Sequence, residues 1–220
     1  MSTTNPRQKT CPPEPQAECR HCSRLVKFRQ QNKQLYPEHF NGAVSSFGDE
    51  RARILILGLA PGLQGANKTG RPFTGDFSGV LLFKCLEALN WTVGENGNHP
   101  DDGLHLRDVM ITNAVRCVPP ENKPTAAEAN NCRPYLISRI AALPHLKVIF
   151  ALGKVAHDSA LRTFGYRLAA YRFAHAAVHL LPNGLTLVDS YHCSRYNVNT
   201  GRLTEEMFME ALQVAKAHME

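Results

Sequence analysis

Residues 53–76 read RILILGLAPGLQGANKTGRPFTGD, a short apolar run followed by a loop rich in glycine. Near-continuous apolar runs of this length are typical of strands that are buried on both faces of a sheet. Three later runs have the same character: 108–115 (DVMITNAV), 146–152 (LKVIFAL) and 185–190 (LTLVDS). Together with residues 53–60, these runs predict four buried strands.

Segments with helical spacing of apolar residues lie beside and between these strands, at 80–89, 126–143, 157–164 and 204–218. An alternation of strands and helices favours a parallel sheet that is covered by helices on both faces. In such sheets, binding sites gather at the carboxyl ends of the strands. These ends carry GLAPGLQGANKTG, NAVRCVPPENK, GKVAH and YHCSRYNVNTG, where we expect the functional residues.

The composition is that of a globular protein with a basic balance. The formal net charge is +6 over 220 residues, which is compatible with a polyanionic partner. No apolar run approaches the roughly 18 residues that a membrane span needs, and the start lacks a signal peptide. We therefore expect a cytoplasmic protein with no membrane partner. The proline-rich residues 1–18, which include Cys11, predict a flexible lead-in, and residues 19–220 predict one domain.

Two pairs of cysteines suggest a metal centre. Cys19 and Cys22 form a C-x-x-C motif. Cys117 lies just after the second predicted strand, and Cys132 lies inside the next predicted helix. Reduced thiols in separated pairs are typical metal ligands, although unrelated buried thiols are the alternative. Their spacing does not distinguish a structural zinc ion from an iron-sulfur cluster.

Two further cysteines lie elsewhere. Cys85 falls on the apolar face of a predicted helix and is expected in the core. Cys193 follows His192, but neighbouring side chains of an extended segment point to opposite sides, which argues against a nucleophile-base pair.

The glycine-rich loop resembles a nucleotide-binding motif only in part. Residues 62–69 nearly match G-x-x-x-x-G-K-T, the loop that holds triphosphates. Asn67 replaces the second glycine, however, and Gly70 and Pro72 break the helix that this motif requires. A loop that ends in Phe73 and Asp76 instead suits a flat ligand, with the ring stacked on it and the carboxylate near its reacting bond.

Three segments and the four cysteines together resemble one family. The segments are GLAPGLQGANKTGRPFTGD (58–76), ITNAVRCVPPENKPT (111–125) and YHCSRYNVNTGRLT (191–204). They are similar to the uracil-DNA glycosylase superfamily, most closely to its family 5, and the resemblance covers roughly residues 15–215. Leu59 differs from the carboxylate of family 4, which favours family 5. Cys193 departs from the usual proline after the active-site histidine.

The resemblance implies a three-layer α/β/α fold with a central four-stranded parallel sheet. It implies that Cys19, Cys22, Cys117 and Cys132 bind a structural 4Fe-4S cluster. The implied activity is that of a monofunctional glycosylase, which hydrolyses the bond between uracil and deoxyribose in DNA and leaves an abasic site. We also expect activity on other deaminated bases such as hypoxanthine. A cluster-bearing module that binds damaged DNA without catalysis is the alternative function.

Site roles follow from the same resemblance. His192 is expected to donate a hydrogen bond to the leaving base, and Asp76 to orient the attacking water, with an N-cap as its competing role. Asn113 is expected to bind the base edge and Phe73 to stack on it, while the backbone from Gly62 to Leu63 lines its far side.

The enzyme would have to flip the base out of the duplex and hold the DNA around it. We expect the protein to bind double-stranded DNA through cationic and polar residues near the site. We also expect it to be a monomer. The predicted DNA contacts are Lys68, Arg71, Arg116, Lys123, Arg195, Tyr196, Asn197, Asn199, Thr200, Gly201 and Arg202.

Overall fold

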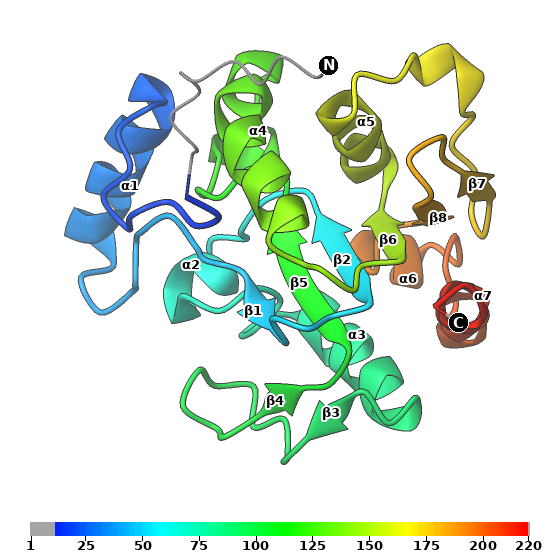
Figure 1. The fold of residues 1–220 in the computed structure, drawn as a ribbon. Coiled ribbons are helices and arrows are strands. Elements are labelled where there is room, and N and C mark those ends of the chain that lie inside the picture. The colour runs from blue at the N-terminus through cyan, green and yellow to red at the C-terminus, as the bar shows by residue number, and fades with distance from the viewer. Residues whose placement is uncertain (1–11, 220) are drawn as a thin grey trace.

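The computed structural model describes residues 12–219, so residues 1–11 of the predicted lead-in, with Cys11, lie outside the described residues. Six strands form the main sheet in the order β1-β5-β2-β6-β8-β7 (Figure 1). Their bounds are β1 Phe47–Gly48, β2 Ile54–Gly58, β5 Val109–Asn113, β6 Val148–Leu152, β7 Val178–Leu180 and β8 Thr186–Ser190. A separate hairpin consists of β3 Thr92–Val93 and β4 His105–Leu106.

The four central strands are the four that the apolar runs predict. β5, β2, β6 and β8 pair in parallel, and every residue of these strands is buried. β1 and β7 add antiparallel edges to the sheet. The predicted four-stranded parallel centre is therefore confirmed, and the sheet is wider than expected by one short strand at each edge.

Helices cover both faces of this sheet. They are α1 Ser23–Leu35, α2 Ala66–Thr69, α3 Phe77–Ala88, α4 Ala126–Ala141, α5 Lys154–Thr163, α6 Arg195–Asn199 and α7 Glu205–Ala217, with short 3-10 turns at η1 Pro120–Asn122 and η2 Leu168–Ala170. Residues of α3 and α7 pack on one face of the sheet, and residues of α4 and α5 pack on the other. The three-layer α/β/α prediction is confirmed. Among residues 12–219, no helix is long and apolar enough to cross a membrane.

Within residues 12–18 of the predicted lead-in, Glu14 contacts the domain. Glu14 pairs with Arg116 at 2.7 Å and with Arg139 at 2.7 Å, and both arginines are buried. The Glu14 carboxylate also accepts a hydrogen bond from the Ser46 backbone N–H at 2.8 Å. These contacts hold the pKa of Glu14 below its usual value, even though burial acts in the opposite direction. The segment around Glu14 is thus attached to the domain, and the flexible lead-in over residues 1–18 stays a prediction.

Candidate active site and candidate metal centre

A cavity with a mainly apolar lining lies where the central strands end. It has a volume of about 360 Å³, which is within the size range of small-molecule sites. Its walls come from the loops after β2, β5, β6 and β8, as expected for a parallel sheet. The lining residues are Leu59, Ala60, Pro61, Gly62, Ala66, Phe73, Asp76, Ser78, Asn113, Asn122, Leu152, Gly153, Lys154, Val155, His192 and Ser194.

The glycines of the first loop give the site its close contacts. A Cβ atom at Gly58 would lie 2.4 Å from Asn113 Oδ1 and 2.9 Å from the Phe73 ring. A Cβ atom at Gly65 would lie 2.2 Å from the Asp76 carboxylate. Because no side chain fits at these positions, glycine allows Asn113, Phe73 and Asp76 to converge on one cavity.

Asp76 serves as a helix cap and also lines the cavity. Its Oδ1 accepts a hydrogen bond from the Gly79 backbone N–H at 3.1 Å at the start of α3. Burial raises the pKa of this carboxyl above its ordinary value, and hydrogen bonds from the first turn only partly oppose that effect. The two roles predicted for Asp76 are therefore compatible in one side chain.

Phe73 is held in a conformation that few non-glycine residues adopt. Its φ is +53°, and its ring lies 6.1 Å from that of His192 with an interplanar angle of 26°. Left-handed residues of this kind persist only where the surrounding structure enforces them, and they cluster at functional sites. Phe73 and His192 thus present two nearly parallel rings in the cavity wall.

Two polar atoms in the site are buried and unpaired within the described part of the chain, Asn113 Oδ1 and His192 Nδ1. Burial lowers the pKa of His192 to about 4, so its imidazole is neutral at pH 7. A neutral imidazole has one N–H donor and one acceptor, and an amide has both functions as well. Both atoms are therefore free to bond to a polar group in the cavity.

Two side-chain contacts hold the loop that follows His192. The Asn197 side chain donates to the His192 carbonyl at 2.8 Å, so its amide holds the loop. Cys193 is buried and its Sγ contacts the Ser78 carbonyl at 3.5 Å. Burial raises the pKa of the Cys193 thiol far above its usual value, which keeps it protonated and agrees with the expectation that it is no nucleophile.

Most of the predicted DNA contacts are exposed, whereas Arg71 and Arg116 are buried and Asn197 is half-buried. Lys68, Arg195, Tyr196 and Arg202 are exposed, as are Lys123, Asn199, Thr200 and Gly201. The guanidinium of Arg195 lies over the Phe77 ring at 5.5 Å, and that of Arg202 lies over the Tyr191 ring at 4.6 Å. Arg195 and Tyr196 thus begin α6, directly after the loop that carries His192.

The prediction of phosphate contacts is wrong for Arg71 and Arg116. Arg71 forms two hydrogen bonds with Asp102, at 2.6 and 2.7 Å, and both side chains are buried. Arg116 is 1% exposed and pairs with Glu14. A guanidinium that is buried against a carboxylate cannot reach DNA. Leu63 also departs from the prediction, because Gly62 lines the cavity and Leu63 does not.

Several lining residues were not predicted individually. Lys154 and Val155 come from the first turn of α5, and Asn122 and Ser194 come from two other strand-end loops. The signal that locates them is the rule that strand ends face the site, applied to the GKVAH segment. The nucleotide-binding alternative fails here, since α2 ends after four residues at Gly70, whose φ is +77°.

The four predicted metal ligands come together on one side of the domain. Cys19 and Cys22, which precede α1, pack with the buried Cys117 and Cys132 in one cluster. None of these four cysteines is in a disulfide. Burial raises the pKa of Cys117 to about 12 and that of Cys132 to about 11. Such thiols would stay protonated without a metal, so these cysteines are either inert core residues or metal ligands.

The spacing of the four sulfurs bears on the choice of metal. Within residues 12–219, only His157, His179 and Asp189 form a set of at least three ligand atoms that lie within 4.8 Å of one another. A single tetrahedral zinc ion with Zn–S bonds of about 2.3 Å would hold its sulfurs about 3.8 Å apart. No three of the four cysteine sulfurs all lie within 4.8 Å of one another.

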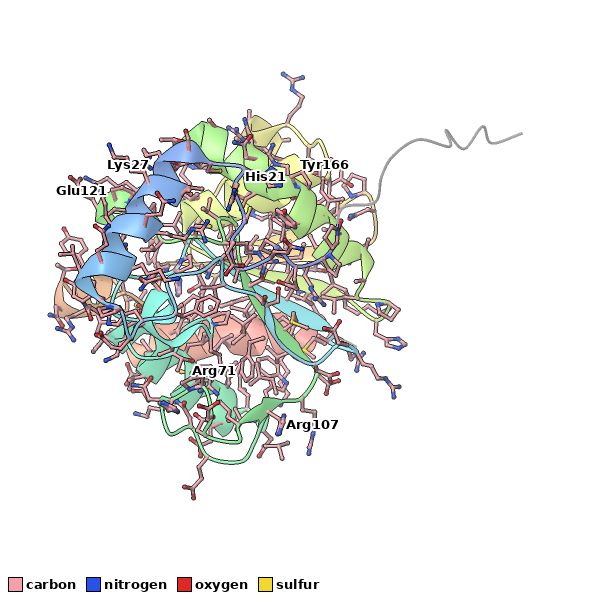
Figure 2. The ribbon with its side chains drawn as sticks, turned by 90° about the vertical axis from the view of Figure 1, so that its left-hand side faces the viewer. His21, Lys27, Arg71, Arg107, Glu121 and Tyr166 are labelled. Atoms are coloured by element: carbon pink, nitrogen blue, oxygen red, sulfur yellow. The ribbon has the colours of Figure 1, made fainter. Side chains whose placement is uncertain are left out.

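Hydrogen bonds fix the segment that carries the candidate ligands Cys19 and Cys22. Arg29 of α1 donates to the backbone carbonyls of Ala17 and Cys19. His21, between the two cysteines, contacts the Tyr135 hydroxyl of α4 at 3.1 Å. Figure 2 shows His21 beside α1 at the top of the domain, in the half away from Arg71.

The set of His157, His179 and Asp189 forms hydrogen bonds within itself. The Asp189 carboxylate lies within hydrogen-bond distance of His157 Nδ1, at 2.8 Å, and of His179 Nε2, at 3.1 Å. The other ring nitrogen of His157 lies 3.0 Å from the Tyr171 carbonyl oxygen. This network therefore ties α5 and β7 to the end of β8.

Comparisons with known proteins agree with this fold and site. The model of the uracil DNA glycosylase superfamily matches residues 45–216, which include the cavity residues. The chain belongs to this superfamily. It is 44% identical to the type-5 uracil-DNA glycosylase of Thermus thermophilus and 40% identical to that of Pyrobaculum aerophilum. These matches cover 90% of the chain and 92% and 88% of the relatives, so the chain is a member of the type-5 branch. A type-4 enzyme of Pyrobaculum aerophilum is 35% identical over 57% of the chain and 56% of its own length.

Proposed function

We propose that this protein is a monofunctional DNA glycosylase that excises uracil and leaves an abasic site. The observation that carries the proposal is the convergence of Asp76, Asn113 and His192 on one cavity that is walled by the Phe73 ring. The cavity offers a flat surface, two unpaired polar atoms and one carboxylate. These are the features needed to bind a base by its edge and face while its bond to the sugar breaks.

The reaction breaks the bond between C1′ of deoxyribose and N1 of uracil. Its electron pair leaves with the base, so positive charge develops on the sugar and negative charge on uracil. Asp76 stabilises the sugar cation and orients a water, whose oxygen bonds to C1′ and whose proton passes to the carboxylate or to solvent. The neutral His192 donates to O2 of the departing base, and its loss would cost on the order of a hundredfold in rate.

Recognition of the base depends on Asn113 and Phe73. The Asn113 amide pairs with O4 and N3–H of uracil, while the Phe73 ring stacks on its face. Because an amide can rotate by half a turn and exchange donor for acceptor, the same residue accommodates hypoxanthine. Other deaminated bases therefore belong to the proposed substrate range.

Exposed residues around the cavity are proposed to hold a flipped nucleotide in duplex DNA. Tyr196 is 72% exposed on α6 and is large enough to occupy the gap that the base leaves. Lys68, Arg195 and Arg202 would contact phosphates, while Asn197 supports the loop. Binding of double-stranded DNA, a monomeric state and a cytoplasmic location remain predictions.

The four cysteines are proposed to bind a 4Fe-4S cluster. Their thiol chemistry and their packing against one another fit such a cluster, which would bridge the N-terminal segment to β5 and α4. The cluster would supply structural cross-links rather than chemistry, because Asp76 and His192 are enough for the reaction. An absorbance band near ~400 nm and iron in fresh protein would support it, whereas stoichiometric zinc with no iron would contradict it.

The function is tested with a duplex that contains one uracil. The protein is incubated at stoichiometric concentration and abasic sites are then cleaved with alkali. Strand breaks at the uracil position are expected. Binding without breaks would favour the damage-binding module instead, and a covalent protein-DNA adduct would indicate a variant that reacts once.

A further inference from the structure

A loop outside the cavity holds the segment that carries Phe73 and Asp76. This loop spans residues 94–104 between β3 and β4, and we call it the hairpin loop. Figure 1 shows the hairpin projecting from the main sheet, and Figure 2 shows Arg71 above it. Asp102 of the hairpin loop binds both terminal nitrogens of Arg71, at 2.6 and 2.7 Å.

Arg71 also bonds to Thr74, the residue after Phe73. Its Nε donates to the Thr74 hydroxyl at 2.7 Å, so one guanidinium spans the left-handed turn at Phe73. The Thr69 hydroxyl also donates to the Thr74 carbonyl at 3.1 Å. The left-handed φ of Phe73 is therefore supported by two hydrogen bonds that hold the next residue, Thr74.

A second contact reaches the residue before Asp76. Asn98 of the hairpin loop accepts a hydrogen bond from the Gly75 backbone N–H at 2.7 Å. Asn98 itself is exposed and has a φ of +56°. The hairpin loop thus touches the catalytic segment at two points, one on each side of Thr74.

The hairpin loop is organised by the same carboxylate that binds Arg71. Asp102 accepts from the backbone N–H groups of Gly97 and Leu104, each at 3.0 Å. The paired guanidinium holds the pKa of Asp102 well below its usual range, so the carboxylate is charged throughout the working range of pH. A bidentate ion pair with additional backbone donors has a fixed geometry.

We propose that Asp102 and Asn98 are positioning residues for base excision. They act through Arg71 and Gly75 and set the placement of the Phe73 ring and the Asp76 carboxylate. This inference rests on the proposed function, and it assigns the β3-β4 hairpin a role in the rate of the reaction rather than in DNA binding. A displacement of reacting groups by about 1 Å can cost on the order of a hundredfold in rate.

The test uses Asp102→Asn, which keeps the shape and removes the charge, and Asn98→Gly, which keeps the left-handed backbone and removes only the acceptor. Asp101→Asn is the matched control, since Asp101 is exposed on the same loop. Three properties are measured: amide hydrogen exchange of residues 71–76, the single-turnover rate on a uracil duplex, and the affinity for abasic duplex.

We expect faster exchange and slower cleavage, by roughly 10- to 100-fold for Asp102→Asn and roughly 5- to 10-fold for Asn98→Gly. Affinity for abasic DNA and all properties of the control should stay within about twofold of wild type. If Asp102→Asn unfolds, Asn98→Gly decides the question. Wild-type exchange and rates in both variants would overturn the inference while leaving the function intact. Inactive wild-type protein would overturn the proposed function alone, because hydrogen exchange still tests the positioning.

Discussion

His192 lines the cavity, and its burial lowers the pKa of its imidazole. The ring lies in the cavity wall with Nδ1 buried and unpaired among the described residues. Its pKa is about 4 in the folded protein, against 6.5 as the ordinary value. A neutral donor suits a leaving base that becomes anionic, since it avoids trapping the product as an ion pair.

This shift predicts an acid-sensitive stability. As the pH falls below 6.5, the unfolded chain binds a proton at this position before the folded protein does, so stability is lost down to about pH 4. Between pH 7 and pH 5 the loss from this one group is about 2 kcal/mol. Urea unfolding of wild type and His192→Asn at both pH values measures it. The same pH dependence in both proteins would contradict the prediction.

The misassigned arginines show where residue-level prediction ends. Both Arg71 and Arg116 follow strands whose ends face the site, which made phosphate contact a reasonable expectation. Their actual partners, Asp102 and Glu14, are 31 and 102 positions away along the chain. Local sequence does not indicate such pairings, whereas the glycines, Phe73, Asp76 and His192 could be found because they lie in two of the segments that carry the family resemblance.

At the scale of elements, the end of β8 is anchored by a buried network. Asp189 is the residue before the end of β8, three positions before His192. It binds His157 of α5 and His179 of β7. Asp189 is completely buried. A buried carboxylate with two histidine partners resists any shift of the strand end, because movement would leave charged or polar groups unpaired.

Asp189→Asn is therefore expected to destabilise the fold by about 3 to 5 kcal/mol. Asp158→Asn serves as the control, because Asp158 pairs with the exposed Lys154 one turn away on α5. That surface pair should contribute about 0.5 kcal/mol or less. Denaturant unfolding compares the two variants. Equal, small losses would mean that the network has no anchoring role.

Sequence patterns predicted the long elements and missed the short or polar ones. The four buried strands have continuous apolar runs, and α3, α4, α5 and α7 have apolar faces. β1 and β7 contain two and three residues and are not fully buried, so they have no pattern to detect. α1 was also missed, because SRLVKFRQQNKQL is polar over most of its length and buries only Leu25, Arg29 and Asn32.

At the scale of the whole molecule, the N-terminal segment depends on two attachments. Glu14 pairs with two buried arginines, and Cys19 and Cys22 pack against Cys117 and Cys132. With a cluster bound at the cysteines, the segment would be cross-linked to β5 and α4. The candidate metal centre and the cavity share the loop after β5, since Asn113 is only four residues from Cys117.

Cys22→Ser should lose iron and lower the melting temperature by about 2 to 4 °C for each kcal/mol of lost stability. Cys85→Ala is the matched cysteine control, because Cys85 lies in the core on α3. It should lose stability through its cavity and keep its iron. Iron analysis and thermal unfolding of both variants distinguish the outcomes, and full iron content in Cys22→Ser would refute the ligand assignment.

The most direct test of the account is uracil release in a single turnover by wild type and Asp76→Asn. Asparagine caps helices as well as aspartate does, so this change preserves the start of α3 and removes the charge. We predict release by wild type and a rate that is on the order of a hundredfold lower in the variant, with unchanged affinity for abasic duplex. No uracil release by wild type at stoichiometric concentration, or equal rates in the two proteins, would contradict the account.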